Sequence, residues 1–129
     1  MAWPDDNAWA VRAGLACGVA APVLWVLMIA LCGALTPGYD HLHDFISELA
    51  AREAPTESLM RNAGFILSGA GYMAFAAALG WRSRCDMLAL VGAGFIALGG
   101  VARVLAGVHA CDLGCSSLRP SVDQDLHYI

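Results

Sequence analysis

Positive charge is scarce in this 129-residue chain, and lysine is absent altogether. Charged residues make up 14% of the sequence, against about 25% in typical soluble domains. The formal net charge of −4 gives phosphates no basic surface to bind, which excludes nucleic acid as a partner. The sequence also lacks a phosphate-binding loop, a nucleophile elbow and a zinc-protease motif, so it does not indicate the enzyme classes that these motifs define.

Apolar residues, in contrast, make up 59% of the chain. A disordered chain needs high charge and few apolar groups, so this composition excludes disorder. A soluble domain of this size cannot bury so much apolar surface. The composition therefore indicates an integral membrane protein whose main partner is the lipid bilayer.

Three long apolar runs define the expected fold. Residues 13–35 and 63–81 carry no charge, and residues 87–108 are interrupted only by Arg103. A helix over the first run reaches roughly 35 Å, enough to cross a hydrocarbon core of about 30 Å. A soluble helix would place polar residues at every third or fourth position, and these runs do not. We predict an all-α transmembrane bundle of three helices in one domain, residues 1–129.

The loop expected at residues 36–62 contains a shorter amphipathic pattern. Between His41 and Leu49 the apolar residues fall on one side of a helix and the polar residues on the other. An interfacial helix that lies on the membrane surface has this pattern. We therefore expect a short amphipathic helix in this loop.

Two residues inside the apolar runs stand out. Pro22 lacks a backbone donor and leaves the Gly18 carbonyl free, which predicts a helix kink. Arg103 is an intramembrane charge. It either extends to the outer interface or pairs with an acid such as Glu48 or Glu57 inside the bundle, and an internal charge is a functional candidate.

Arginine positions suggest an orientation. The turn at residues 82–86 holds Arg82 and Arg84, and Arg12 lies just before the first run. Cytoplasmic loops of membrane proteins are enriched in such residues. We therefore expect a cytoplasmic N-terminus, with the loop 36–62 and the tail 109–129 outside.

The topology places the first loop and the tail on one face whichever side is outside, because two helices separate them. That face holds all four histidines and eight of the eleven acidic residues. It also holds Cys111 and Cys115, two of the five cysteines. We expect this polar surface to be extracytoplasmic.

The cysteine pair has two interpretations. On an extracytoplasmic face, Cys111 and Cys115 would most simply form a small disulfide loop. In a reducing compartment they could instead bind zinc together with His109 or His127. The spacing of three intervening residues is not the strong two-residue spacing of zinc sites, which favours the disulfide.

A catalytic interpretation combines the histidines with nearby acids. Membrane-embedded metal hydrolases use histidine ligands and a metal-bound water as nucleophile. Loop histidines and acids are otherwise simply solvated. The candidate zinc ligands are His41, His43, His109 and His127.

Several of these motifs resemble an uncharacterised bacterial and archaeal membrane family called domain of unknown function 998. The likeness rests on residues 46–49 after a turn at 37–39, on residues 62–65, and on residues 107–115 followed by His127. Residues 108–110 depart from the family's usual aromatic-proline pair, so His109 is particular to this chain. The resemblance implies no established activity, and the polar residues it marks for testing are Ser47, Glu48, Asn62, Asp112 and His127.

Members of the family that this chain resembles carry about six helices, so the resemblance covers their front half. The resemblance therefore implies either a missing C-terminal half or a homo-oligomer, and a bacterial inner membrane. Our leading hypothesis is a multi-pass membrane protein with a polar extracytoplasmic face. The alternatives are a membrane-embedded metal-dependent hydrolase, with Ser47, Glu48, Asp112 and His127 as catalytic candidates, and half of a small transporter or channel.

Overall fold

The computed structural model describes residues 8–115 and 121–127, which form helices joined by turns and short irregular segments. Three helices are long and apolar enough to cross a membrane: Ala8–Leu35, Glu57–Arg82 and Met87–Val108. The predicted all-α bundle with three membrane-spanning helices is therefore confirmed. Residues 116–120 and 128–129 of the tail that we expected at 109–129 lie outside the described part of the chain.

The middle long helix is built from three consecutive segments. A single α-turn, α2 (Glu57–Leu59), leads into the π-helix η3 (Met60–Leu67), and α3 (Ser68–Arg82) completes it. A π-helix has wider i→i+5 hydrogen bonding, is rare, and is frequent at functional sites. The Ser68 hydroxyl donates to the Gly64 carbonyl oxygen where the π-segment ends.

The third long helix, α4 (Met87–Val108), matches the predicted bounds, and a cap explains its start. The Asp86 carboxylate accepts hydrogen bonds from the backbone N–H groups of Leu88 and Ala89, at 3.0 and 3.2 Å. These are two of the donors that a helix start leaves unpaired. The first helix, α1 (Ala8–Leu35), begins earlier than the predicted residue 13 and continues unbroken through Pro22.

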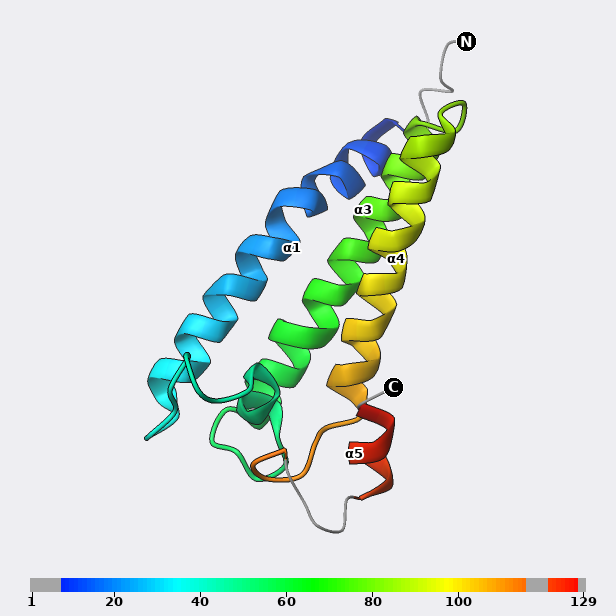
Figure 1. Cartoon of the computed structure of the whole chain (residues 1–129). Coiled ribbons are helices and arrows are strands. Elements are labelled where there is room, and N and C mark those ends of the chain that lie inside the picture. The colour runs from blue at the N-terminus through cyan, green and yellow to red at the C-terminus, as the bar shows by residue number, and fades with distance from the viewer. Residues whose placement is uncertain (1–7, 116–120, 128–129) are drawn as a thin grey trace.

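Figure 1 shows α3 between α1 and α4, and α3 packs along both of them. Glycines permit this close approach. A Cβ atom on Gly69 would lie 2.8 Å from the Gly100 carbonyl oxygen, and one on Gly100 would lie 2.8 Å from the Gly69 carbonyl oxygen. On the other side, Gly14 faces Ala78 and Gly71 faces Ala21 at similarly short separations. Because lipid provides no hydrophobic drive for association, such backbone contact holds the helices together.

The amphipathic helix predicted for residues 41–49 is shorter than expected. The structure has turns up to residue 45 and then a 3₁₀-helix, η2 (Ile46–Ala50). The Asp40 carboxylate accepts from the Leu42 N–H at 2.8 Å, and the Asp44 carboxylate accepts from the Asp40 N–H at 2.7 Å. Side-chain hydrogen bonds of this kind compete with helix formation.

The loop folds back onto the ends of the long helices. Leu49 and Ala50 of η2 are buried together with Cys32, Met60 and Phe65, all at or near the same end of the bundle. The short helix α5 (Val122–His127) lies at this end as well (Figure 1). We call residues 36–56, 109–115 and 121–127 together the cap.

Candidate functional site

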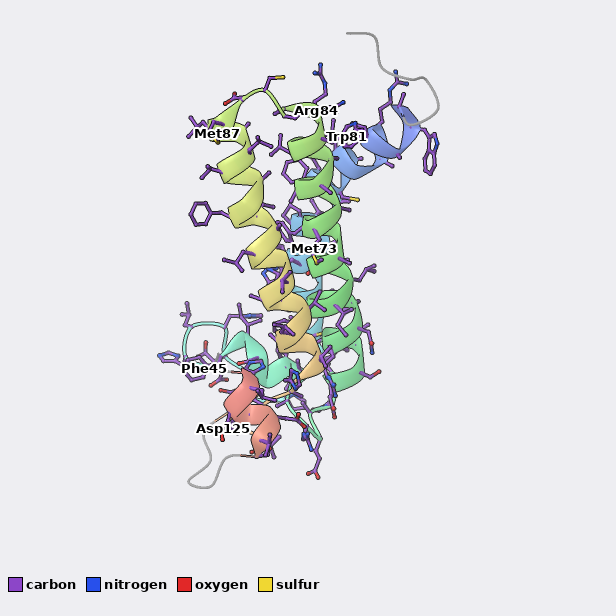
Figure 2. All side chains as sticks on the ribbon, turned by 90° about the vertical axis from the view of Figure 1, so that its right-hand side faces the viewer. Phe45, Met73, Trp81, Arg84, Met87 and Asp125 are labelled. Carbon is purple, nitrogen blue, oxygen red and sulfur yellow. A yellow bond between two sulfur atoms is a disulfide. The ribbon has the colours of Figure 1, made fainter. Side chains whose placement is uncertain are left out.

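The cap is joined from two segments that are far apart in the sequence. Figure 2 shows Phe45 and Asp125 at one end of the bundle, and Trp81, Arg84 and Met87 at the other. Arg52 of the loop forms an ion pair with Asp123 of α5, and its backbone N–H donates to the Cys111 carbonyl oxygen at 3.0 Å. The loop and the tail therefore form one folded unit.

The cysteine pair lies at the centre of this unit. The Sγ atoms of Cys111 and Cys115 are at disulfide-bonding distance, and their Cα atoms are 5.2 Å apart. Both side chains are buried in a small cluster with Ala51. Ser47 lies beside the pair, with its Oγ 3.4 Å from the Cys115 Sγ and its carbonyl oxygen 3.5 Å from the Cys111 Sγ. This geometry agrees with the disulfide interpretation of the two cysteines.

Arg61 fixes the end of α4 to the middle helix, and sequence reasoning missed this role. Its Nε donates to the Gly107 carbonyl oxygen at 2.8 Å, and its Nη2 donates to the Val108 carbonyl oxygen at 2.9 Å. Its Nη1 pairs with Glu57 at 2.9 Å, one helical turn earlier. The only sequence signal was this i, i+4 spacing of opposite charges. Arg61 therefore satisfies carbonyl groups that a helix end leaves without partners.

The four histidines separate into two pairs. The His43 Nδ1 lies 2.8 Å from an Asp40 oxygen, and the His41 ring packs edge-on against Tyr39. In the tail, the His109 Nδ1 lies 3.2 Å from an Asp123 oxygen. Among residues 8–115 and 121–127, no three His, Cys, Asp or Glu side chains are arranged to hold a metal ion. The predicted four-histidine zinc set stays a prediction.

The catalytic candidates occupy different parts of the cap. The Glu48 carboxylate accepts from the Phe45 N–H at 3.2 Å, and the His127 Nδ1 donates to the His109 carbonyl oxygen at 2.7 Å. The Asp112 carboxylate accepts from the Ser121 N–H at 2.9 Å. Ser47 faces the cysteine pair rather than a base. Glu48, Asp112 and His127 therefore bond to three different backbone partners, and Asn62 bonds to Ser58.

Two cap carboxylates are held in their ionised form by hydrogen bonds. The backbone N–H of Leu42, and then the His43 side chain, lower the pKa of Asp40 below its usual range. The backbone N–H and the hydroxyl of Ser121 lower the pKa of Asp112 in the same way. These bonds order both halves of the cap, since each carboxylate closes a turn of its own segment.

A small pocket of about 170 Å³ opens on the cap. Tyr39, Asp44 and Glu48 line its polar side, and the turn at Leu113 and Gly114 faces them. The Tyr39 hydroxyl is buried and has no hydrogen-bond partner among the described residues. Burial, followed by the charges of Asp44 and Glu48, raises the pKa of Tyr39. The pocket is therefore lined by two acidic side chains and by a tyrosine whose buried hydroxyl has no partner among the described residues.

Arg103 does not take either of its expected positions. Its guanidinium lies over the ring of Trp25 at 4.1 Å and over the ring of Tyr72 at 4.8 Å. Glu57 pairs with Arg61 instead, and Glu48 bonds to the Phe45 backbone. Helical side chains lean toward the N-terminus of their helix, which for α4 is the end remote from the cap. The side chain therefore turns into the bundle and not out to the interface.

One family model matches residues 19–129, and its description is "Protein of unknown function (DUF998)". The match covers most of the chain, including the cap and Arg103. The chain belongs to the DUF998 family. The resemblance inferred from the sequence motifs is thus confirmed. No curated protein matches this DUF998 chain, and no solved structure matches it.

Proposed function

We propose that this DUF998 protein is a multi-pass protein of the bacterial inner membrane whose working surface is the cap on the extracytoplasmic face. Family membership and three apolar helices make it a membrane protein of unknown function. The proposal goes beyond this by assigning the cap to the extracytoplasmic side of the membrane. It is supported by the cysteine pair, since disulfides persist in oxidising compartments and are rare in the cytosol.

The single observation that carries the proposal is how the cap is built. One ion pair, one backbone hydrogen bond and the packing of the buried cysteine pair against Ala51 tie the loop to the tail across more than fifty residues of sequence. A solvated loop would need none of these contacts. A cap built in this way holds its side chains in fixed positions, as a binding surface requires. The pocket of Tyr39, Asp44 and Glu48 is the part of this surface that we assign to a small polar ligand.

Thiol labelling on intact cells tests the orientation. Leu42 in the cap is 88% exposed, and the free thiol of Cys85 is exposed in the turn at the opposite end. We compare the wild-type chain with a Leu42→Cys variant that also carries Cys85→Ser. A membrane-impermeant maleimide should label the thiol introduced at position 42 in intact spheroplasts, and Cys85 of the wild-type chain only after the membrane is opened.

The reverse labelling pattern would place the cap in the cytoplasm and refute the extracytoplasmic assignment. Labelling of both positions in intact spheroplasts would refute the topology itself. A chain that carries Cys85→Ser without the Leu42 substitution measures background from Cys17 and Cys32, which belong to α1.

A further inference from the structure

The charge on Arg103 has no counter-charge among the described residues. No hydrogen bond or ion pair joins it to another residue within 8–115 and 121–127, and its Nη1 is fully buried without a partner. Two aromatic rings attract the guanidinium but accept no conventional hydrogen bond from its edge. A buried donor without a partner is costly, and more so when it is charged. Charged residues in membrane helices are typical of sites that bind substrates or ions.

The guanidinium bridges two helices that hardly touch. Arg103 belongs to α4 and Trp25 to α1, while α3 packs between those helices and provides Tyr72. The residue keeps part of its surface exposed. Nη1 is the only guanidinium nitrogen of Arg103 that is fully buried, so the other nitrogens of the group keep some accessible surface.

The surface of α4 leading away from Arg103 is unfilled. Gly92, Ile96 and Gly99 precede Arg103 by eleven, seven and four residues, so they share one face of the helix with it. A Cβ atom built on Gly92 or on Gly99 would have no neighbour within 4 Å. Open space therefore lies beside Gly99 and beside Gly92, on the side of α4 that carries Arg103.

The depth of Arg103 indicates the shape of the ligand. Its Cα lies five residues before the end of α4, or about 7.5 Å along the axis. The guanidinium lies deeper than this Cα, because the side chain leans away from the cap. An anionic group from the cap-side interface must therefore enter the bilayer to reach it, and a chain attached to it would continue toward the bilayer centre. That direction is the one in which Gly99 and then Gly92 lie.

We propose that Arg103, held by Trp25 and Tyr72, binds the carboxylate or phosphate group of an anionic amphiphile. The hydrocarbon chain of this ligand lies along Gly99 and Gly92. The anion supplies the missing counter-charge and accepts hydrogen bonds from the guanidinium, which recognises planar carboxylates and phosphates in two-point contacts. The proposal depends on the membrane topology alone, and not on the orientation of the cap or on a ligand in its pocket.

Quenching of Trp25 fluorescence tests the proposal in the full chain. The protein is placed in nanodiscs of zwitterionic lipid, and its three tryptophans other than Trp25 are replaced by phenylalanine so that Trp25 is the only indole fluorophore. The probe is stearate carrying a doxyl spin label near the carboxylate, at a pH where the carboxylate is ionised. We expect saturable quenching that unlabelled stearate reverses and that the labelled methyl ester does not produce.

Variants locate the site. Arg103→Gln should raise the half-saturating mole fraction about tenfold, which is what loss of a charge-assisted hydrogen bond produces. Gly99→Leu fills the open face, leaves Arg103 in place, and should weaken binding several-fold. Gly94→Leu is the matched control, because Gly94 also has open space around it but lies on the opposite side of α4. It should leave the half-saturating fraction unchanged.

Further arms identify the source of the anion. Preferential quenching by doxyl-labelled phosphatidylglycerol over the phosphatidylcholine analogue would assign the site to phospholipid, and quenching by stearate alone would assign it to a fatty-acid carboxylate. Either result supports the proposal. Equal quenching by the charged and methyl-ester probes, or quenching unchanged in both Arg103→Gln and Gly99→Leu, would overturn it. If inorganic phosphate displaces the probe equally well from the wild-type chain and from Gly99→Leu, the site binds a free anion. That result would also overturn the amphiphile assignment.

Discussion

Replacing Gly100 with valine should destabilise the bundle by about 3 kcal/mol, at the upper end of the usual cost of overpacking. The added Cβ would lie 2.8 Å from the Gly69 carbonyl oxygen and 3.1 Å from the Met73 backbone nitrogen. Both neighbours are backbone atoms of α3, so no side-chain rotation can relieve the contact. The two helices would have to separate, and the close approach that replaces hydrophobic association in lipid would be lost.

Titration with SDS from lipid–detergent mixed micelles measures this free energy. Gly94→Val is the matched control on the same helix, because a Cβ at Gly94 meets nothing within 4 Å. It should change the unfolding free energy by no more than about 0.5 kcal/mol. Equal stability of the two variants would show that α3 and α4 do not cross at Gly69 and Gly100.

Replacing Arg61 with methionine should cost about 2–3 kcal/mol, because charge-assisted hydrogen bonds are lost within a partly buried site. The methionine keeps an apolar stem but leaves the carbonyl groups of Gly107 and Val108 and the carboxylate of Glu57 without their partner. The end of α4 and the tail that follows it should then detach from the middle helix. Hydrogen exchange of residues 107–115 should rise together with the loss of stability.

Arg52→Met is the comparison for this second prediction. The ion pair of Arg52 with Asp123 is exposed, and exposed ion pairs are usually worth about 0–1 kcal/mol. The same SDS titration should therefore separate the two arginines clearly. A larger loss from Arg52→Met than from Arg61→Met would mean that the exposed ion pair of Arg52, and not the partly buried contacts of Arg61, holds the cap to the bundle.

The membrane-spanning helices could be predicted because their signal is local. A run of apolar residues long enough to cross a bilayer must satisfy its backbone hydrogen bonds internally, and a helix does this without reference to other segments. The ends at Leu35 and Val108 therefore match the predicted bounds. Two of the starts differ: α1 begins at Ala8 and not at residue 13, and the middle helix begins at Glu57 and not near residue 63, because each helix continues through the polar residues that bound its apolar run.

The cap and the Arg103 site could not be predicted in the same way, because they depend on how separate segments align. Arg61 reaches the end of α4 only because Gly107 brings the two helices close together. Arg103 contacts Trp25 only because of the relative positions of α1 and α4, and the periodicity of residues within one helix does not specify these positions. The predicted partners Glu48 and Glu57 were chemically reasonable, but nearer hydrogen-bond donors hold both of them.

Membrane fractionation tests the central claim, that three apolar helices use lipid as their solvent. Membranes from cells expressing the chain are washed with alkaline carbonate and then extracted with a mild detergent. We expect the protein to remain in the carbonate pellet and to enter solution only with detergent. Recovery as a monodisperse species in the detergent-free aqueous fraction would contradict the account.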